Sequence, residues 1–212
     1  MWARRFVGLK VEQSDPHTSQ RETVPRQKGI FHLIRAIQHM TPGIQVVLCA
    51  GAPDTPMIDA EMRAAVAEAQ AKHPGVVWIN EMIGNEEKIE LYSHAGVFCC
   101  PSIYEPFGII NLEAMACGTA VVATATGGIK EVVVHGETGY LVPIDQMNES
   151  PFEAKDPEQF SRDLAERINE VMADTGLRTR MAKAGRLRAE KHFAWSSIAR
   201  RTADLYAMIV GK

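Results

Sequence analysis

The sequence predicts an α/β fold: a Rossmann-like parallel sheet with helices on both faces, ending in a helical tail. From Gly29 onwards, strand-like and helix-like segments alternate along the chain and are joined by short loops, as in repeated β-α units. The strand-like segments VVLCA and AVVATA are apolar along nearly their whole length. This is typical of parallel strands that are covered by helices on both faces.

Short apolar runs between turn residues predict the strands. The first, RRFVG, precedes residues 9–25, which are polar, lack periodicity and contain two prolines. Residues 9–25 are therefore predicted to form an irregular loop. Five further strands are expected at residues 44–50, 76–80, 96–102, 119–125 and 139–143.

Apolar residues spaced three or four positions apart predict the helices. In residues 29–40 four such residues share one face, and Pro42 ends the helix. Asp54 or Thr55 is expected to cap a second helix that runs to about Lys72. Further helices are expected at residues 85–95, 108–116, 127–136, 157–173, 176–191 and 195–210.

The length and these elements suggest three parts. Residues 1–25 would form a strand and a loop, residues 26–156 a Rossmann-like domain, and residues 157–212 the C-terminal helices. A formal net charge of −3 argues against a general nucleic-acid binder. No apolar run approaches the roughly 20 residues of a membrane span. The first residues, MWARRFVG, lack the apolar core of a signal peptide.

The four cysteines indicate thiols rather than a disulfide framework or a zinc site. Cys49, Cys99, Cys100 and Cys117 show no CxxC spacing, and each lies among apolar residues. We expect buried, reduced thiols and a cytoplasmic protein.

The loops that follow the predicted strands would line one crevice. Ligands on parallel sheets bind beyond the carboxyl ends of the strands. The loops at Gly51, residues 101–108 and residues 124–128 all follow strands. A binding site is therefore expected where these three loops meet.

The stretch EPFGIINLEAMACG places Glu105 and Glu113 in this region. Glu105 precedes Pro106 and belongs to a loop, whereas Glu113 lies inside the following helix. No set of His, Asp or Glu residues that could hold a metal is visible, and nothing nearby is suited to raise a carboxyl pKa for acid/base catalysis. Ionised carboxylates would suit the vicinal hydroxyls of a sugar or ribose. The alternative that both carboxylates are merely solvated stays open.

Two helix starts are candidates for binding phosphate. Arg26-Gln27-Lys28-Gly29 opens one predicted helix with basic residues, and Thr126-Gly127-Gly128 opens another on the same side of the sheet. Two helix N-termini and one or two cations could neutralise a diphosphate without a metal. Both segments could equally be ordinary helix starts, because no GxGxxG or GxxxxGK[ST] motif is present.

In combination, these segments resemble a known family. RQKGIFHLIRAI and PSIYEPFGIINLEAMACGTAVVATATGGIKEVVVHGETGYLVP are similar to the C-terminal half of family-4 retaining glycosyltransferases of the GT-B fold. Within them the chain most resembles bacterial glycogen synthases of the actinobacterial type, which include enzymes that make maltose 1-phosphate from ADP-glucose. The resemblance runs from about Arg26 to Tyr206 and depends mainly on the E-x7-E motif and the GG-x-x-E turn.

The resemblance implies a role for each candidate residue. Glu105 would accept hydrogen bonds from the transferred hexose, and Glu113 would hold the ribose hydroxyls. Lys28 would bind the diphosphate and stabilise the departing nucleotide. Backbone amides near the start of the following helix, at Phe107, Gly108 and Ile109, would contact the sugar and phosphates. Transfer would retain the anomeric configuration and require no metal or other cofactor, because protein cations and helix dipoles stabilise the charge.

The resemblance also implies substrates and a missing partner. The expected reaction moves glucose from a nucleotide-glucose, ADP-glucose above all, to an α-glucan or glucose 1-phosphate in glycogen biosynthesis. Leu9 follows Gly8 where the family usually has an Arg, and Arg26 is a substitute in a different register. The chain also has no room for the N-terminal acceptor domain, so we expect little activity from it alone.

Other interpretations of the sequence remain open. The last helix, around Trp195 to Ile209, normally crosses back to the acceptor domain, so its apolar face could instead support self-association. The chain could also be a non-catalytic module that binds a sugar nucleotide or pairs with another subunit. A nucleotide-sugar epimerase-like protein is a third alternative.

Overall fold

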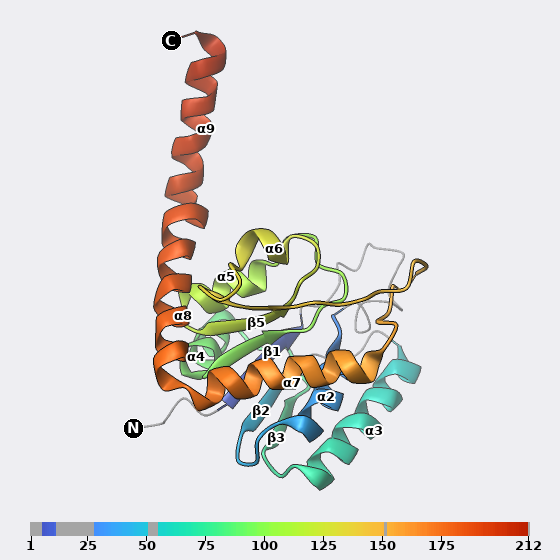
Figure 1. Ribbon diagram of the computed structural model, residues 1–212. Coiled ribbons are helices and arrows are strands. Elements are labelled where there is room, and N and C mark those ends of the chain that lie inside the picture. The colour runs from blue at the N-terminus through green and yellow to red at the C-terminus, as the bar shows by residue number, and fades with distance from the viewer. Residues whose placement is uncertain (1–5, 12–27, 51–54, 151, 212) are drawn as a thin grey trace.

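The computed structural model describes residues 6–11, 28–50, 55–150 and 152–211, and it confirms the predicted α/β architecture (Figure 1). Within these residues six parallel strands form one sheet in the order β3-β2-β1-β4-β5-β6. The strands are β1 (Phe6–Val11), β2 (Gln45–Ala50), β3 (Val76–Ile79), β4 (Val97–Cys100), β5 (Ala120–Thr124) and β6 (Gly139–Val142). The order reverses between β1 and β4, which is where sheets of this kind bind ligands.

The helices follow the predicted apolar periodicity. They are α2 (Ile30–Ala36) with the 3-10 turn η2 (Ile37–His39), α3 (Pro56–Lys72), α4 (Asn85–His94), α5 (Ile109–Ala116), α6 (Ile129–Val132), α7 (Pro157–Ala173), α8 (Thr175–Arg188), the π-helical segment η3 (Ala189–Phe193) and α9 (Trp195–Val210). Thr55 caps α3 as predicted, because its hydroxyl accepts a hydrogen bond from the Ile58 amide.

Two predicted segments are wrong in their bounds. The loop expected from residue 9 begins later, because β1 continues to Val11 and its backbone pairs with β2 as far as Ala50. The helix expected over residues 127–136 is only the four-residue α6. It ends because Val133 adopts extended backbone, and the chain then returns to the sheet as β6. The remainder of the predicted loop, together with Gly51 and Asp54, lies outside the described residues.

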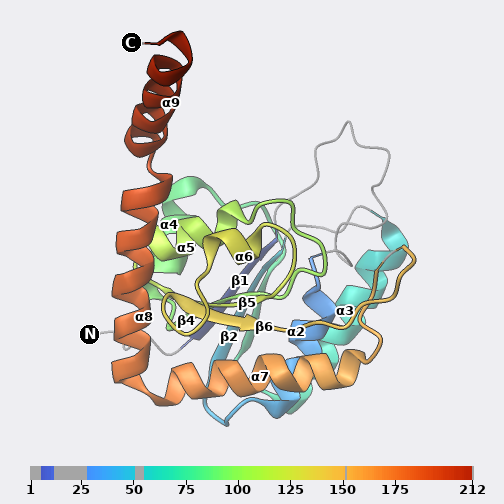
Figure 2. The ribbon, with the colours of Figure 1, turned by 45° about the horizontal axis from the view of Figure 1, so that its top comes forward.

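Alternating residues of the central strands enter two separate cores. Val97 and Cys99 of β4 pack with α2, α3 and α7 on one face of the sheet. Phe98 and Cys100 pack with α4, α5 and α6 on the other face. Figure 2 shows these helices on either side of the strands. Because both faces are covered, the strands need apolar residues at successive positions, as their sequences predicted.

The cysteines are mostly buried, as predicted. Cys49, Cys99 and Cys100 are buried, whereas Cys117 is half-buried. Burial raises the pKa of the Cys99 and Cys100 thiols above their ordinary value. Both groups therefore stay protonated at neutral pH and act as small apolar side chains.

Helix α9 projects away from the body of the molecule (Figures 1 and 2). None of its described residues is buried, and Trp195 is 85% exposed. Its large exposed apolar side chains are Trp195, Leu205, Tyr206, Met208, Ile209 and Val210. Within the described part of the chain, no helix combines the length and apolar character needed to cross a bilayer.

Candidate functional site

The site is built around an ion pair between two loops at the carboxyl edge of the sheet. Lys28 directly precedes Gly29 and α2, and Glu105 lies in the loop between β4 and α5. Lys28 Nζ is 2.7 Å from Glu105 Oε2, and the two side chains are only 17% and 10% exposed. The structure thus brings together two predicted residues that are distant in the chain.

Gly29 allows the close approach that places Lys28 beside Glu105. Its φ of 65° lies in the left-handed region, and a Cβ atom there would be 1.9 Å from the Pro101 carbonyl oxygen. Only glycine fits this contact with the backbone that follows β4. The start of α2 is therefore packed directly on the loop that carries Glu105.

The glycine pair Gly127-Gly128 supports this loop from the other side. The Gly128 amide donates to the Glu105 carbonyl oxygen at 3.0 Å. A Cβ atom on Gly127 would lie 2.0 Å from that oxygen, and one on Gly128 would lie 2.5 Å from the Phe107 Cα atom. The main structural contribution of this pair is therefore to hold residues 105–107 against the short helix α6.

Helix α5 begins at this loop with its first amides uncapped. Gly108 occupies the N-cap position with a φ of 97° and makes no side-chain capping bond, and Ile109 is 57% exposed. The first amides of an α-helix have no partner within the helix. Uncapped helix amides of this kind suit an anionic group.

Glu113 is held by two side chains of α4. Lys88 Nζ lies 2.9 Å from its Oε1 atom, and the Tyr92 hydroxyl donates to Oε2 at 3.1 Å. Tyr92 is itself buried and packs edge-on against Phe98. The interpretation of Glu113 as merely solvated is therefore wrong. Because Glu105 and Glu113 have separate partners, the geometry gives no support for a shared acid/base pair.

Asn111 is a further polar residue at the site. Its side chain is fully buried, and among the described residues neither its amide nitrogen nor its oxygen has a partner at full hydrogen-bond distance, although its contact with the Cys100 thiol acts to lower the pKa of that thiol. A Cβ atom on Gly108 would lie 2.9 Å from the Asn111 Nδ2 atom, so this amide lies directly under the start of α5. Among the described residues, no three His, Cys, Asp or Glu side chains are grouped as metal ligands would be.

Sequence reasoning missed three residues of the site: Lys88, Tyr92 and Asn111. Lys88 and Tyr92 are four positions apart, and this spacing predicts a shared helix face. Nothing in the sequence shows that this face meets Glu113. The predicted phosphate ligand Arg26 lies outside the described residues.

A cavity of about 940 Å³ lies at the opposite edge of the sheet. It is bordered by residues of α2, η2 and α3 and by residues 42–45 and 73–75, where the chain enters β2 and β3. The cavity is therefore separate from the Lys28–Glu105 pair, which lies beyond the carboxyl ends of the strands.

Comparison with known proteins identifies the family. Residues 21–188 match the family described as "Glycosyl transferases group 1". The chain belongs to this family. The match includes the Lys28–Glu105 pair, Glu113 and the Gly127-Gly128 turn, so the group 1 glycosyltransferase domain contains the whole described site.

Individual relatives of the group 1 domain agree with this assignment. The chain is 43% identical over 201 residues to α-maltose-1-phosphate synthase of Mycolicibacterium smegmatis. The matched region covers 95% of this chain and 50% of that protein. The chain thus spans about half the length of the curated relatives it matches. Sucrose-phosphate synthase from Thermosynechococcus elongatus has a similar fold, with a TM-score of 0.73 and 30% identity over 98% of this chain and 46% of the other.

A second solved structure supports the GT-B fold alone. HepE of Anabaena, in complex with UDP-glucose, superposes with a TM-score of 0.72 at 23% identity. The superposition covers 97% of this chain and 49% of that one. The group 1 domain described here, with its Rossmann-like sheet and terminal helix, therefore corresponds to about half of a GT-B fold.

Proposed function

We propose that this chain is the donor-binding domain of a cytoplasmic, retaining hexosyltransferase. ADP-glucose is the proposed donor, and an α-glucan or glucose 1-phosphate in glycogen biosynthesis is the proposed acceptor. The observation that carries the proposal is the Lys28–Glu105 pair beside the uncapped start of α5. It places a cation, a hydroxyl acceptor and helix amides together at the edge of a parallel sheet where ligands bind.

Lys28 and the first amides of α5 would hold the diphosphate of the donor. A nearly buried ammonium group interacts strongly with a phosphate oxygen, because little water screens the charge. Negative charge grows on the diphosphate as the sugar departs, and Lys28 would stabilise it. We propose that these groups suffice without a metal ion, so donor affinity should be the same in EDTA and in Mg²⁺.

The two glutamates would bind hydroxyl groups at different parts of the donor. Glu105 would accept hydrogen bonds from the hexose, and Glu113 would accept them from the ribose. Each already has partners, but a carboxylate offers about four lone-pair positions and can accept further bonds. Lys88 and Tyr92 would keep the Glu113 carboxylate oriented while ribose binds.

The proposed reaction exchanges one bond at the anomeric carbon for another on the same face. The bond between the anomeric carbon and the diphosphate oxygen breaks, and a bond to the acceptor hydroxyl oxygen forms. The acceptor proton passes to the departing phosphate oxygen. Lys28 would hold that phosphate in position as it gains charge.

The similarity to α-maltose-1-phosphate synthase supports the choice of donor and acceptor, and HepE, which shares the fold, is itself a protein that binds UDP-glucose. The acceptor half of the cleft would come from a second domain of the kind that the longer relatives contain. The exposed apolar residues of α9 would pack on that domain or on a second copy of this chain. We therefore expect little glucosyl transfer from this chain alone.

Calorimetric titration of the chain with ADP-glucose, UDP-glucose and GDP-glucose tests the donor site. Selective binding of ADP-glucose is expected, and binding of none of the three would contradict the proposal. Fusing the chain to the amino-terminal half of the Mycolicibacterium relative tests catalysis. An active fusion that loses activity in Lys28→Ala would support a transferase, whereas donor binding with an inactive fusion would favour a non-catalytic binding module.

A further inference from the structure

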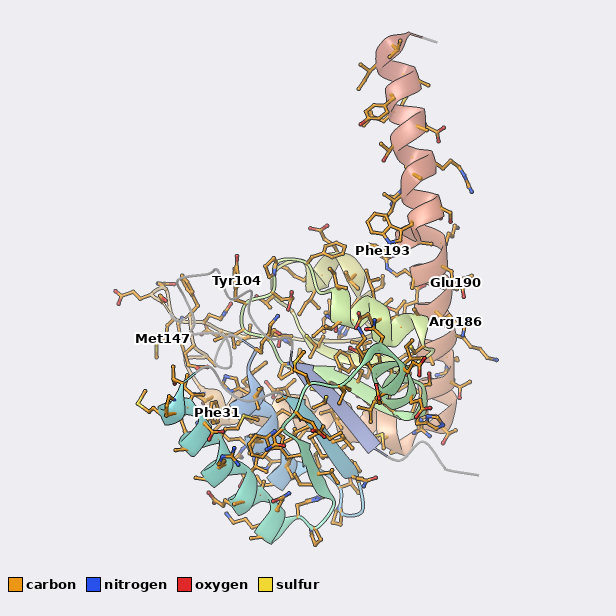
Figure 3. All side chains as sticks on the ribbon, turned by 180° about the vertical axis from the view of Figure 1, so that it is seen from behind. Phe31, Tyr104, Met147, Arg186, Glu190 and Phe193 are labelled. Carbon is orange, nitrogen blue, oxygen red and sulfur yellow. The ribbon has the colours of Figure 1, made fainter. Side chains whose placement is uncertain are left out.

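An aromatic contact joins the donor-site loop to the C-terminal helices. The Phe107 and Phe193 rings have centroids 6.1 Å apart and planes inclined by 62°, an edge-to-face arrangement. Phe107 lies in the loop between Glu105 and α5, and Phe193 is the last residue of the π-helical segment η3. Figure 3 shows Phe193 at the point where α9 leaves the body of the protein.

Arg188, the last residue of α8, reinforces this contact. Its guanidinium group lies over the Phe193 ring, 5.5 Å from the centroid. The same group donates to the Val132 carbonyl oxygen at 2.8 Å and to the Glu131 carbonyl oxygen at 2.7 Å. Arg188 thus caps the end of α6 and also packs on the ring of Phe193.

The two contacts converge on one short stretch of backbone. Phe193 packs on the Phe107 side chain, while Gly128, the N-cap residue of α6, leaves so little room beside Phe107 that a Cβ atom there would lie 2.5 Å from the Phe107 Cα atom. Phe107 is itself 38% exposed. Besides the backbone contacts with Gly127 and Gly128, the position of Phe107 and of the Gly108 and Ile109 amides after it therefore also depends on groups from the end of α8 and from η3.

The local backbone at Phe193 is unusual. Residues Ala189–Phe193 form a π-helical turn, and Ala194 then adopts extended backbone before α9 begins. Arg201 of α9 donates to the His192 carbonyl oxygen at 2.7 Å, which fixes the start of α9 to this turn. Single π-helical turns inserted into α-helical chains occur frequently at functional sites.

We propose that Phe193 is a positioning residue for the donor site. It holds Phe107, and through it the first amides of α5, in the geometry that receives the donor diphosphate. The proposal rests on the proposed function for its consequence in donor binding, but the positioning itself is a property of the ligand-free chain. Phe193 belongs neither to the E-x7-E motif nor to the GG-x-x-E turn, so the proposal adds a new residue to the site.

Hydrogen–deuterium exchange of the ligand-free chain tests the positioning directly. In Phe193→Ala the amides of residues 107–110 should exchange several-fold faster, while those of the buried strands β4 and β5 stay unchanged. Leu187→Ala and Trp195→Ala are matched controls, because both side chains are exposed on the same run of helices. Unchanged exchange at residues 107–110 in Phe193→Ala, or equal acceleration in either control, would overturn the proposal.

Donor titration of the same variants gives the second readout. Phe193→Ala should weaken sugar-nucleotide affinity by about two- to tenfold, the size expected for one edge-to-face aromatic pair. Phe193→Tyr should restore both affinity and slow exchange, because it keeps the ring. If Phe193→Ala does not fold, Phe193→Leu replaces it, with the same expectation. Failure of the wild-type chain to bind any donor would contradict the proposed function, and the exchange result would still decide the role of Phe193.

Discussion

Lys28 Nζ and Glu105 Oε2 are 2.7 Å apart, although 77 positions separate the two residues in the chain. Two glycines make this possible. Gly29 brings the start of α2 onto the backbone after β4, and Gly128 holds the Glu105 carbonyl from the opposite side. The pair satisfies two nearly buried charges before any donor arrives, so each residue affects stability as well as binding.

Lys28→Ala should weaken donor affinity by at least tenfold, since it removes a charged hydrogen bond worth about 1.5–3 kcal/mol. It should also lower the free energy of unfolding by about 1–3 kcal/mol, because Glu105 loses its partner. Calorimetric titration and urea denaturation measure the two effects. Lys72→Ala, which breaks an exposed ion pair with Glu68, is the control. It should change donor affinity and the free energy of unfolding only slightly. Wild-type affinity in Lys28→Ala would remove Lys28 from the proposed site.

Recognition of ribose by Glu113 can be tested with a donor that lacks the ribose 2′-hydroxyl. The wild-type chain should prefer the ribonucleotide by about tenfold or more, as expected for a hydrogen bond to a charged group. Glu113→Ala should lose this preference, and Tyr92→Phe should reduce it, because one of the bonds that orient the carboxylate is gone. Tyr206→Phe on exposed α9 is the matched control. If wild type and Glu113→Ala prefer the ribonucleotide donor equally, Glu113 does not bind the ribose 2′-hydroxyl.

Gly127→Ala should destabilise the protein more than Gly43→Ala. Both glycines have positive φ, at 45° and 90°, so both substitutions introduce left-handed strain of about 1–2 kcal/mol. At Gly127 the new Cβ would also meet the Glu105 carbonyl oxygen, at 2.0 Å, whereas no atom of the described residues lies within 4 Å of a Cβ at Gly43. Thermal denaturation should show the larger loss for Gly127→Ala. Equal losses of thermal stability in the two variants would mean that the loop at Glu105 can move away from the new Cβ atom without destabilising the protein.

The His32–Glu153 contact predicts an acid-sensitive contribution to stability. Burial acts to raise the pKa of Glu153, but hydrogen bonds from His32 and the Ala154 amide outweigh it, and the pKa lies below its ordinary value. A carboxyl with a lowered folded-state pKa stabilises the protein above its unfolded pKa of about 4.3, and this contribution is lost as pH falls through the folded-state value.

The free energy of unfolding should therefore differ between wild type and Glu153→Gln at neutral pH. The difference should shrink below about pH 4.3, where the wild-type carboxyl becomes protonated in the unfolded chain and then in the folded one. Glu149→Gln, in the same loop, is exposed and should show no such trend. If the difference in the free energy of unfolding between wild type and Glu153→Gln does not change with pH, ionisation of Glu153 does not contribute to stability.

The strand and helix pattern was accessible from the sequence because it depends on local regularities. Apolar runs such as VFCC alternate between two buried faces, so they require no information from distant residues. The predicted bounds were wrong where contacts with distant parts of the chain determine the local backbone. Residues 9–11 look like loop residues but become strand because β2 offers a row of backbone partners. The helix expected after Gly128 stops at Val132 because the chain must return to the sheet at β6.

Local sequence patterns were enough to predict the fold class, the carboxyl-edge position of the candidate site and the chemical types of Lys28, Glu105 and Glu113. These follow from periodicity, turn residues and motif spacing, all of which are properties of nearby residues. The partners became visible in the packed molecule: Glu105 with Lys28, Glu113 with Lys88 and Tyr92, and Phe107 with Phe193. Ion pairs and ring contacts need atoms within a few ångströms, and only the packed helices around the sheet bring such distant residues that close.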